Sequence, residues 1–172
     1  VGAPLVADPR IAGVAFTGST DTARGINQVL AARGGPIVPL IAETGGQNAM
    51  IVDSSALPEQ VVRDVLISSF QSAGQRCSAL RVLFLQEDVA DGIIEMLQGA
   101  ARELKIGDPL DYATDVGPVI DAEAKSTLDQ YKARMRVEAG KLIDLPLPES
   151  YAHGTYVAPA IYAIPSIKLL QG

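Results

Sequence analysis

The chain has 172 residues, 48 % of them hydrophobic, and a mean hydropathy of +0.21, so it can bury a sizeable core and is not a disordered chain. Its net charge of −6, its pI near 4.7 and its scattered basic residues argue against a nucleic-acid groove, which needs clustered Lys and Arg. No apolar run approaches the roughly 20 residues that span a bilayer, and the N-terminus lacks the charged region of a secretion signal.

The cysteine content and the first residue bear on the compartment and the extent of the protein. A single cysteine cannot form an internal disulfide and fits a reducing cytoplasm, so we expect a cytoplasmic protein. The sequence does not begin with methionine, so we expect it to be a piece of a longer protein.

Apolar runs and amphipathic segments alternate along the chain. The apolar runs predict strands over 11–16, 49–52, 79–86 and 141–143, and a further apolar run over 36–42 ends at Glu43. Apolar residues at helical spacing predict helices after Ser19 and over 58–73, 87–104 and 121–135. This order favours an α/β fold with a doubly wound, mostly parallel sheet covered by helices on both faces.

The turn after the first predicted strand contains Gly18 and Ser19. A strand that leads into a helix through such a turn presents free backbone N–H groups, and the helix dipole favours a phosphate there. Ser and Thr also cap helices everywhere, so these residues alone favour a plain cap. The usual Gly-x-Gly-x-x-Gly fingerprint of a dinucleotide site is absent.

Two short motifs, Glu-Thr-Gly-Gly at 43–46 and Gly-Gln-Arg-Cys at 74–77, place Glu43 and Cys77 34 positions apart. A cysteine nucleophile needs an exposed turn, which glycine supplies, and a separate base. Taken singly, a lone cysteine is usually an inert buried residue and a lone glutamate a solvated charge. Arg76 either favours the Cys77 thiolate by its charge or faces solvent.

The two motifs together, in this order and at this spacing, resemble the aldehyde dehydrogenase superfamily. The resemblance implies that Cys77 attacks an aldehyde, that a hydride passes to NAD, and that Glu43 activates the water that hydrolyses the resulting thioester. Residues 16–20 resemble the family's cofactor-binding turn. This resemblance implies NAD-binding residues at Gly18, Ser19, Thr44 and Gly45, and it implies no metal.

Residues 42–53 and 74–79 are similar, more narrowly, to the pyrroline-5-carboxylate dehydrogenase domains of bacterial bifunctional proline-utilisation proteins. The likeness covers essentially the whole chain, and glutamine at Gln47, where most superfamily members have lysine, fits this group. It implies oxidation of L-glutamate γ-semialdehyde to L-glutamate, with Ser78 holding the substrate α-carboxylate. It also implies a family strand over 154–160, and FAD only in a proline dehydrogenase domain outside this chain.

We interpret residues 1–42 as the C-terminal end of an NAD-binding domain and 43–172 as the N-terminal part of a catalytic domain. The family's upstream oxyanion asparagine and several NAD-binding segments are not in this sequence, so we expect this piece to be inactive. We also expect its apolar faces to cause self-association. The alternatives are another aldehyde dehydrogenase, an assembly domain with an inert Cys77, and a Cys-His hydrolase that uses His153.

Overall fold

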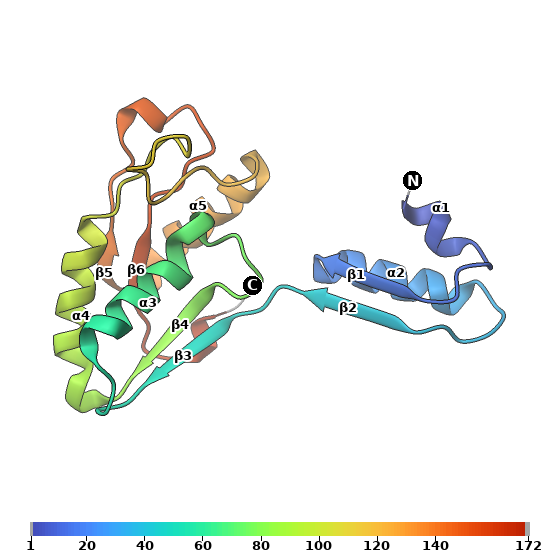
Figure 1. The fold of residues 1–172 in the computed structure, drawn as a ribbon, viewed down its shortest axis with the longest axis horizontal. Helices are drawn as coiled ribbons and strands as arrows, with labels where there is room; N and C mark the ends of the chain where they lie inside the picture. The colour runs from blue at the N-terminus through green and yellow to red at the C-terminus, as the bar shows by residue number, and fades with distance from the viewer. Residues whose placement is uncertain (1, 171–172) are drawn as a thin grey trace. The chain divides into compact units, whose positions relative to one another are not determined.

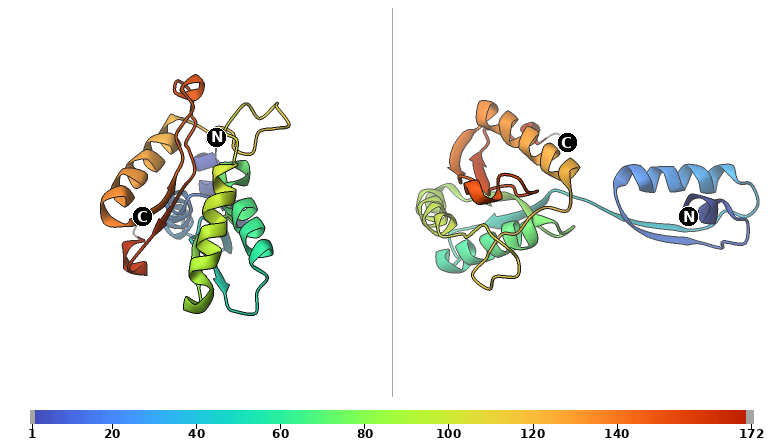
Figure 2. Two further views of the ribbon diagram at one scale, coloured as in Figure 1. Left: turned by 90° about the vertical axis from the view of Figure 1, so that its left-hand side faces the viewer. Right: turned by 90° about the horizontal axis from the view of Figure 1, so that it is seen from above.

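The structure, a computed structural model, describes residues 2–170. The chain folds as two compact units, Val1–Gly46 and Gln47–Gly172, called here the N-terminal unit and the C-terminal unit (Figures 1 and 2). None of the described helices is long and apolar enough to cross a membrane.

The N-terminal unit is a two-stranded parallel sheet with helices packed beside it (Figure 1). Its elements are α1 (Gly2–Ala7), β1 (Val14–Gly18), α2 (Thr20–Ala32) and β2 (Leu40–Thr44). Arg33, at the end of α2, donates hydrogen bonds to the carbonyls of Val6, Asp8 and Ile11. This side chain therefore ties the segment before β1 to the end of α2.

The C-terminal unit contains one parallel and one antiparallel strand pair (Figure 2). Its longer elements are β3 (Asn48–Val52), α3 (Pro58–Phe70), β4 (Leu80–Leu85), α4 (Glu87–Arg102), α5 (Ala122–Glu138), β5 (Gly140–Asp144) and β6 (Ala160–Ala163). Short 3-10 turns lie at Gln71–Gly74, Glu149–Tyr151 and Ile167–Leu169. β3 pairs with β4 in parallel, and β5 pairs with β6 antiparallel.

The main core lies where α3 and α4 pack on the β3–β4 sheet. Its buried side chains are Val52, Val61, Val62, Val65, Leu80, Ile93 and Leu97. Leu57 precedes α3, and Pro58 begins it at a position where a missing N–H costs nothing. Burial of these branched side chains against one sheet face fixes α3, and hence the segment that follows it, relative to β3 and β4.

The predicted α/β class is confirmed, although the described strands pair only in twos and one pair is antiparallel. Several boundaries differ from prediction, and the strand predicted over 11–16 is β1 at Val14–Gly18. Two further differences change the expected structure. The helix predicted over 58–73 ends at Phe70, where the chain leaves helical geometry. The strand expected over 154–160 is irregular up to Pro159, which has no N–H for strand pairing, and β6 begins only at Ala160.

Candidate active site

The carboxyl ends of β1 and β2 bring the predicted cofactor residues of the N-terminal unit together. In the parallel register Thr17 lies opposite Glu43 and Gly18 opposite Thr44. α2 begins directly after Ser19, so its first N–H groups lie at the same edge. The carboxyl end of a parallel sheet beside a helix N-terminus is where phosphate-containing ligands bind in many α/β proteins.

Local contacts explain both residues of the β1–α2 turn. Ser19 is the N-cap of α2: its Oγ accepts from the Thr22 N–H at 3.2 Å and donates to Thr22 Oγ1 at 2.9 Å. Ser19 therefore caps α2. A Cβ at Gly18 would lie 2.5 Å from Cζ of Phe16, so a larger residue there would displace that ring. The turn is exposed and remains open to a ligand.

Cys77 is exposed and lies in a turn a few residues after the end of α3. Ser72, Ala73 and Gly74 have φ angles of 58°, 52° and 67°. Three successive left-handed residues reverse the chain sharply, and only glycine adopts this conformation without a steric cost. We call residues 71–79 the cysteine loop. It presents the thiol and Ser78 to solvent.

Side chains distant in sequence hold the cysteine loop. The Asn48 amide, at the start of β3, donates from Nδ2 to the carbonyls of Cys77 at 2.6 Å and Ala79 at 3.0 Å. Arg81 Nη2 donates to the carbonyl of Gly74 at 2.6 Å. Gln75 bonds to the segment 118–120. Sequence reasoning did not identify Asn48 or Gln75 as holding this loop, because their partners lie in other parts of the chain.

Arg76 is exposed, as one of the two alternatives for it has it, and it also contacts the end of α3. Its Nη2 donates to the carbonyl of Ile67 at 2.9 Å, and that of Ser68 lies within 3.4 Å. The guanidinium therefore binds the last carbonyls of α3, a favourable place for a positive charge because of the helix dipole. Among the described residues, no group accepts a hydrogen bond from the backbone N–H of Cys77.

The predicted residues fall into two sets. Gly18, Ser19, Glu43, Thr44 and Gly45 belong to the N-terminal unit. Cys77 and Ser78 belong to the C-terminal unit, as does the exposed His153. Cys77 and Ser78 are neighbours in the cysteine loop, and no hydrogen bond or ion pair among the described residues joins His153 to either of them. Nowhere between residues 2 and 170 do three or more His, Cys, Asp or Glu side chains gather to hold a metal ion.

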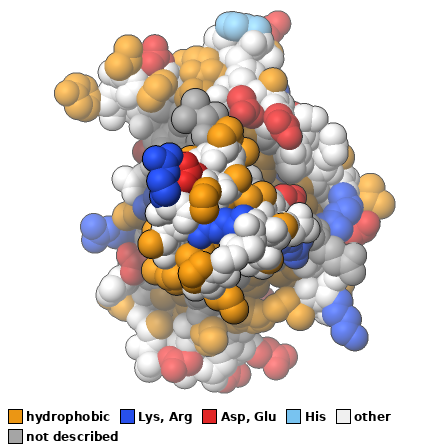
Figure 3. Space-filling model, turned by 90° about the vertical axis from the view of Figure 1, so that its right-hand side faces the viewer, with side chains coloured by type: hydrophobic (Ala, Val, Ile, Leu, Met, Phe, Trp, Pro, Cys, Tyr) orange, Lys and Arg blue, Asp and Glu red, His pale blue; other side chains and the backbone are white. Residues whose placement is uncertain are grey.

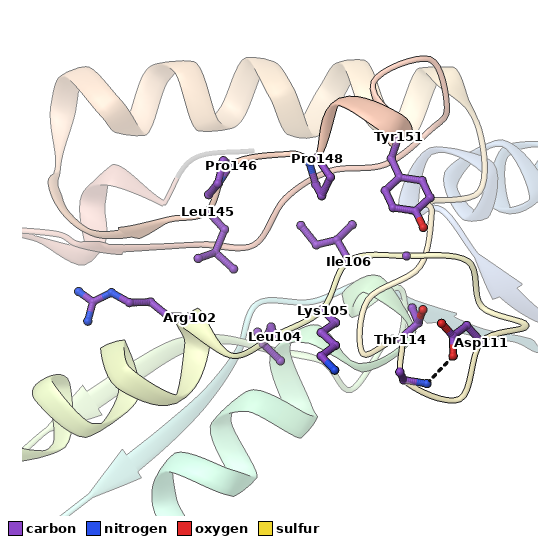
Figure 4. Close-up of a pocket in the computed structure, with 12 residues that line it drawn as sticks. Arg102, Leu104, Lys105, Ile106, Asp111, Thr114, Leu145, Pro146, Pro148 and Tyr151 are labelled. Atoms are coloured by element: carbon purple, nitrogen blue, oxygen red, sulfur yellow. Dashed lines mark hydrogen bonds between the residues drawn. The ribbon is translucent and has the colours of Figure 1, made fainter.

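A pocket of about 410 Å³ lies elsewhere in the C-terminal unit. The segment that follows α4 and the segment that follows β5 border it. In Figure 4, Ile106 from the segment after α4 faces Pro148 and Tyr151 from the segment after β5. Arg102 and Lys105 also line it. Neither Cys77 nor Ser78 does, so the pocket is separate from the cysteine loop.

A sequence profile described as the aldehyde dehydrogenase family matches residues 1–168. The chain therefore belongs to the aldehyde dehydrogenase family.

The similar proteins within this family include bifunctional PutA proteins. The chain is 51 % identical to the bifunctional protein PutA of Escherichia coli K12 and 53 % identical to that of Rhizobium meliloti, in each case over 99 % of the chain. It spans 14 % of the length of each of these relatives.

Solved structures give the same result for the fold. A mutant of proline utilization A (PutA) from Bradyrhizobium japonicum aligns with a TM-score of 0.90 and 64 % identity, over 96 % of this chain and 17 % of that one. A 1-pyrroline-5-carboxylate dehydrogenase from Thermus with bound NAD aligns with a TM-score of 0.88 and 28 % identity, over 99 % of this chain and 34 % of that one. The predicted aldehyde dehydrogenase fold is confirmed.

Proposed function

We propose that this chain is part of an NAD-dependent dehydrogenase that oxidises L-glutamate γ-semialdehyde to L-glutamate. The observation that carries the proposal is the exposed Cys77, held in a turn by side chains from other segments, in a chain similar to PutA over almost its full length. Under this proposal residues 1–42 end the NAD-binding domain and residues 43–172 begin the catalytic domain.

The chemistry assigned to these residues begins at the Cys77 thiolate. Its sulfur attacks the aldehyde carbon and forms a hemithioacetal, a step that suits cysteine because it is a strong nucleophile near neutral pH. The Cys77 N–H, free of other partners among the described residues, is available to the developing oxyanion. Loss of hydride converts the hemithioacetal into a thioester. Glu43 then takes a proton from water, which attacks the thioester and releases the acid and the thiol.

NAD supplies the hydride acceptor when it is bound. The edge formed by Gly18, Ser19 and Thr44 fits its pyrophosphate, because Gly18 has no side chain to block the approach and the N–H groups of α2 begin there. Gly45 follows Thr44 at the same edge. Ser78, exposed beside Cys77, is proposed to bind the substrate carboxylate through its hydroxyl.

The test is NADH formation from glutamate semialdehyde and NAD by the 172-residue chain, by its Cys77→Ser variant, and by the same protein lengthened at both ends. We expect little turnover by the short chain and turnover by the longer one, which Cys77→Ser removes. Retained turnover in the Cys77→Ser variant would contradict the role of the thiol. Comparison of acetaldehyde with glutamate semialdehyde separates this substrate from those of other aldehyde dehydrogenases.

An assembly role is favoured by the apolar side chains that both units expose (Figure 3). On the β3–β4 sheet, Ile51 and Phe84 lie opposite each other in register and are 82 % and 42 % exposed. Adjacent apolar side chains on a sheet face form a patch that favours association. We therefore propose that the chain self-associates through this face.

Substitution of Ile51 by lysine is expected to shift the sedimentation of the chain toward the monomer, because a charge at the centre of an apolar contact must be desolvated. Val137 on α5 is 86 % exposed, and Val137→Lys is the matched control. Sedimentation at several concentrations measures the effect. Equal sedimentation of parent and Ile51→Lys, both as monomers, would rule out self-association.

A further inference from the structure

Gln75 uses every polar atom of its side-chain amide. Nε2 donates to the carbonyls of Ser72 at 3.2 Å and Pro118 at 3.3 Å, while Oε1 accepts from the backbone N–H of Ile120 at 2.7 Å. One carbonyl and the N–H two residues later are the groups that a neighbouring strand would bond. The side chain of Gln75 therefore pairs with residues 118–120 in the way that a peptide group of a strand would.

The segment 118–120 is itself fixed to the body of the C-terminal unit. The Val119 N–H donates to the carbonyl of Thr155 at 2.9 Å, and Thr155 Oγ1 donates to the carbonyl of Val119 at 2.7 Å. The Val119 side chain is only 3 % exposed. Alternate residues thus face inward and outward: Val119 anchors the segment, and its two neighbours bind Gln75.

The cysteine loop has few backbone bonds of its own at this point. Its left-handed turn closes with one bond from the Gln75 N–H to the carbonyl of Ser72 at 3.1 Å, and Cys77 follows two residues later. Asn48 fixes the other flank of Cys77 from β3. Arg81 and Arg76 hold the loop through the Gly74 carbonyl and the end of α3, and the Ala79 N–H donates to the carbonyl of Arg76 at 3.1 Å. Gln75 is the side chain that connects the loop to residues 118–120.

We propose that Gln75 is a positioning residue for Cys77: its amide pairs with Pro118 and Ile120 and so fixes the cysteine loop to the segment anchored at Val119. The proposal rests on the proposed function in one respect, the catalytic role of the Cys77 thiol. The connection itself is testable whether or not the chain turns over an aldehyde.

The test uses the lone cysteine as the attachment point for a nitroxide spin label, whose spectrum reports the mobility of residue 77. Gln75→Met removes all three side-chain hydrogen bonds at similar length, whereas Gln75→Glu keeps the acceptor for the Ile120 N–H and loses both donors. We expect greater label mobility in both variants. Amide hydrogen exchange at Ile120 should be faster by about two- to tenfold in Gln75→Met and nearly unchanged in Gln75→Glu.

Gln98 provides the matched control, because its Nε2 also donates to a backbone carbonyl, that of Leu142 at 3.1 Å. Gln98→Glu loses the same kind of bond outside the cysteine loop, so label mobility and Ile120 exchange should not change. Parent-like mobility and exchange in folded Gln75→Met would overturn the proposal. If Gln75→Met does not fold, unchanged spin-label mobility in Gln75→Glu would overturn the proposal instead. Failure of the dehydrogenase assay would leave both readouts unaffected, which separates the two proposals.

Discussion

Replacement of Gly74 by alanine is expected to lower the free energy of unfolding by about 2–4 kcal/mol. Gly74 is buried at a φ of 67°, where a side chain is strained. A Cβ there would lie 2.6 Å from the Ser69 carbonyl oxygen, a backbone atom that cannot move without disturbing α3. It would also lie 2.9 Å from Nη1 of Arg81, whose other nitrogen binds the Gly74 carbonyl. Urea unfolding followed by circular dichroism measures the loss.

Gly99→Ala is the control for this experiment and should have the opposite sign. Gly99 lies inside α4, and no atom lies within 4 Å of a Cβ built there. Alanine in a helix interior is favoured over glycine by about 0.5–1 kcal/mol, so this variant should be more stable than the parent. Equal stability of the parent and Gly74→Ala would show that residues 72–74 do not form the left-handed turn.

Hydrophobic periodicity predicts most of the helices and the core. In the helix predicted over 87–104, the apolar residues at helical spacing include Ile93, Leu97 and Ala101, and in α4 these are 2 %, 3 % and 0 % exposed. Met96 belongs to the same apolar spacing but is 38 % exposed, because it lies at the border of the apolar stripe rather than at its centre. Periodicity depends on neighbours three and four residues away, which is why it predicts the packed face well and its edges less well.

The sequence predicts the reactive residue of the cysteine loop but not the backbone conformation of the loop. The motif places Cys77 in a turn after a glycine, and this is where the structure has it. Ser72 and Ala73 carry no local signal for a left-handed conformation, so the apolar pattern extends the predicted helix to Ala73. The hydrogen bond from Asn48 to Cys77 spans 29 positions and that from the Ile120 N–H to Gln75 spans 45, and no local pattern encodes them.

The pairing of β5 with β6 is a second feature that sequence reasoning did not predict. The alternation of strands and helices up to α4 favours parallel pairing, and both β1–β2 and β3–β4 follow it. The segment between β5 and β6 contains only a short 3-10 turn and no crossover helix, and β6 runs antiparallel to β5. The tilted contact between Tyr151 and Tyr156, with ring centroids 4.7 Å apart, packs this segment.

Asp144, the last residue of β5, is expected to contribute a pH-dependent part of the stability of the C-terminal unit. Its side chain is only 10 % exposed; Oδ2 accepts from Arg136 Nε at 2.6 Å, and Oδ1 lies 3.2 Å from Lys132 Nζ. The hydrogen bond from Arg136 lowers the pKa of Asp144, burial opposes this, and Lys132 lowers the pKa further. Both cations belong to α5, so the carboxylate joins that helix to β5.

The sign of the effect follows from the lowered pKa of Asp144. The ionised form is favoured in the folded chain, so its stabilisation is fully present above the unfolded-state pKa of about 3.9 and is lost as the pH falls through the lower folded-state value. Asp144→Asn should lower the free energy of unfolding by about 1–3 kcal/mol at neutral pH. The difference from the parent should shrink as the pH falls below about 4.

Asp129 provides the comparison, because its ion pair with Lys125 at 2.9 Å is half-exposed. Asp129→Asn should change the free energy of unfolding by less than about 0.5 kcal/mol, since water already screens that pair. Urea unfolding at a series of pH values measures both variants. A loss for Asp144→Asn that is the same at every pH would mean that the residue acts through packing. A loss that fades in acid identifies its charge as the link between α5 and β5.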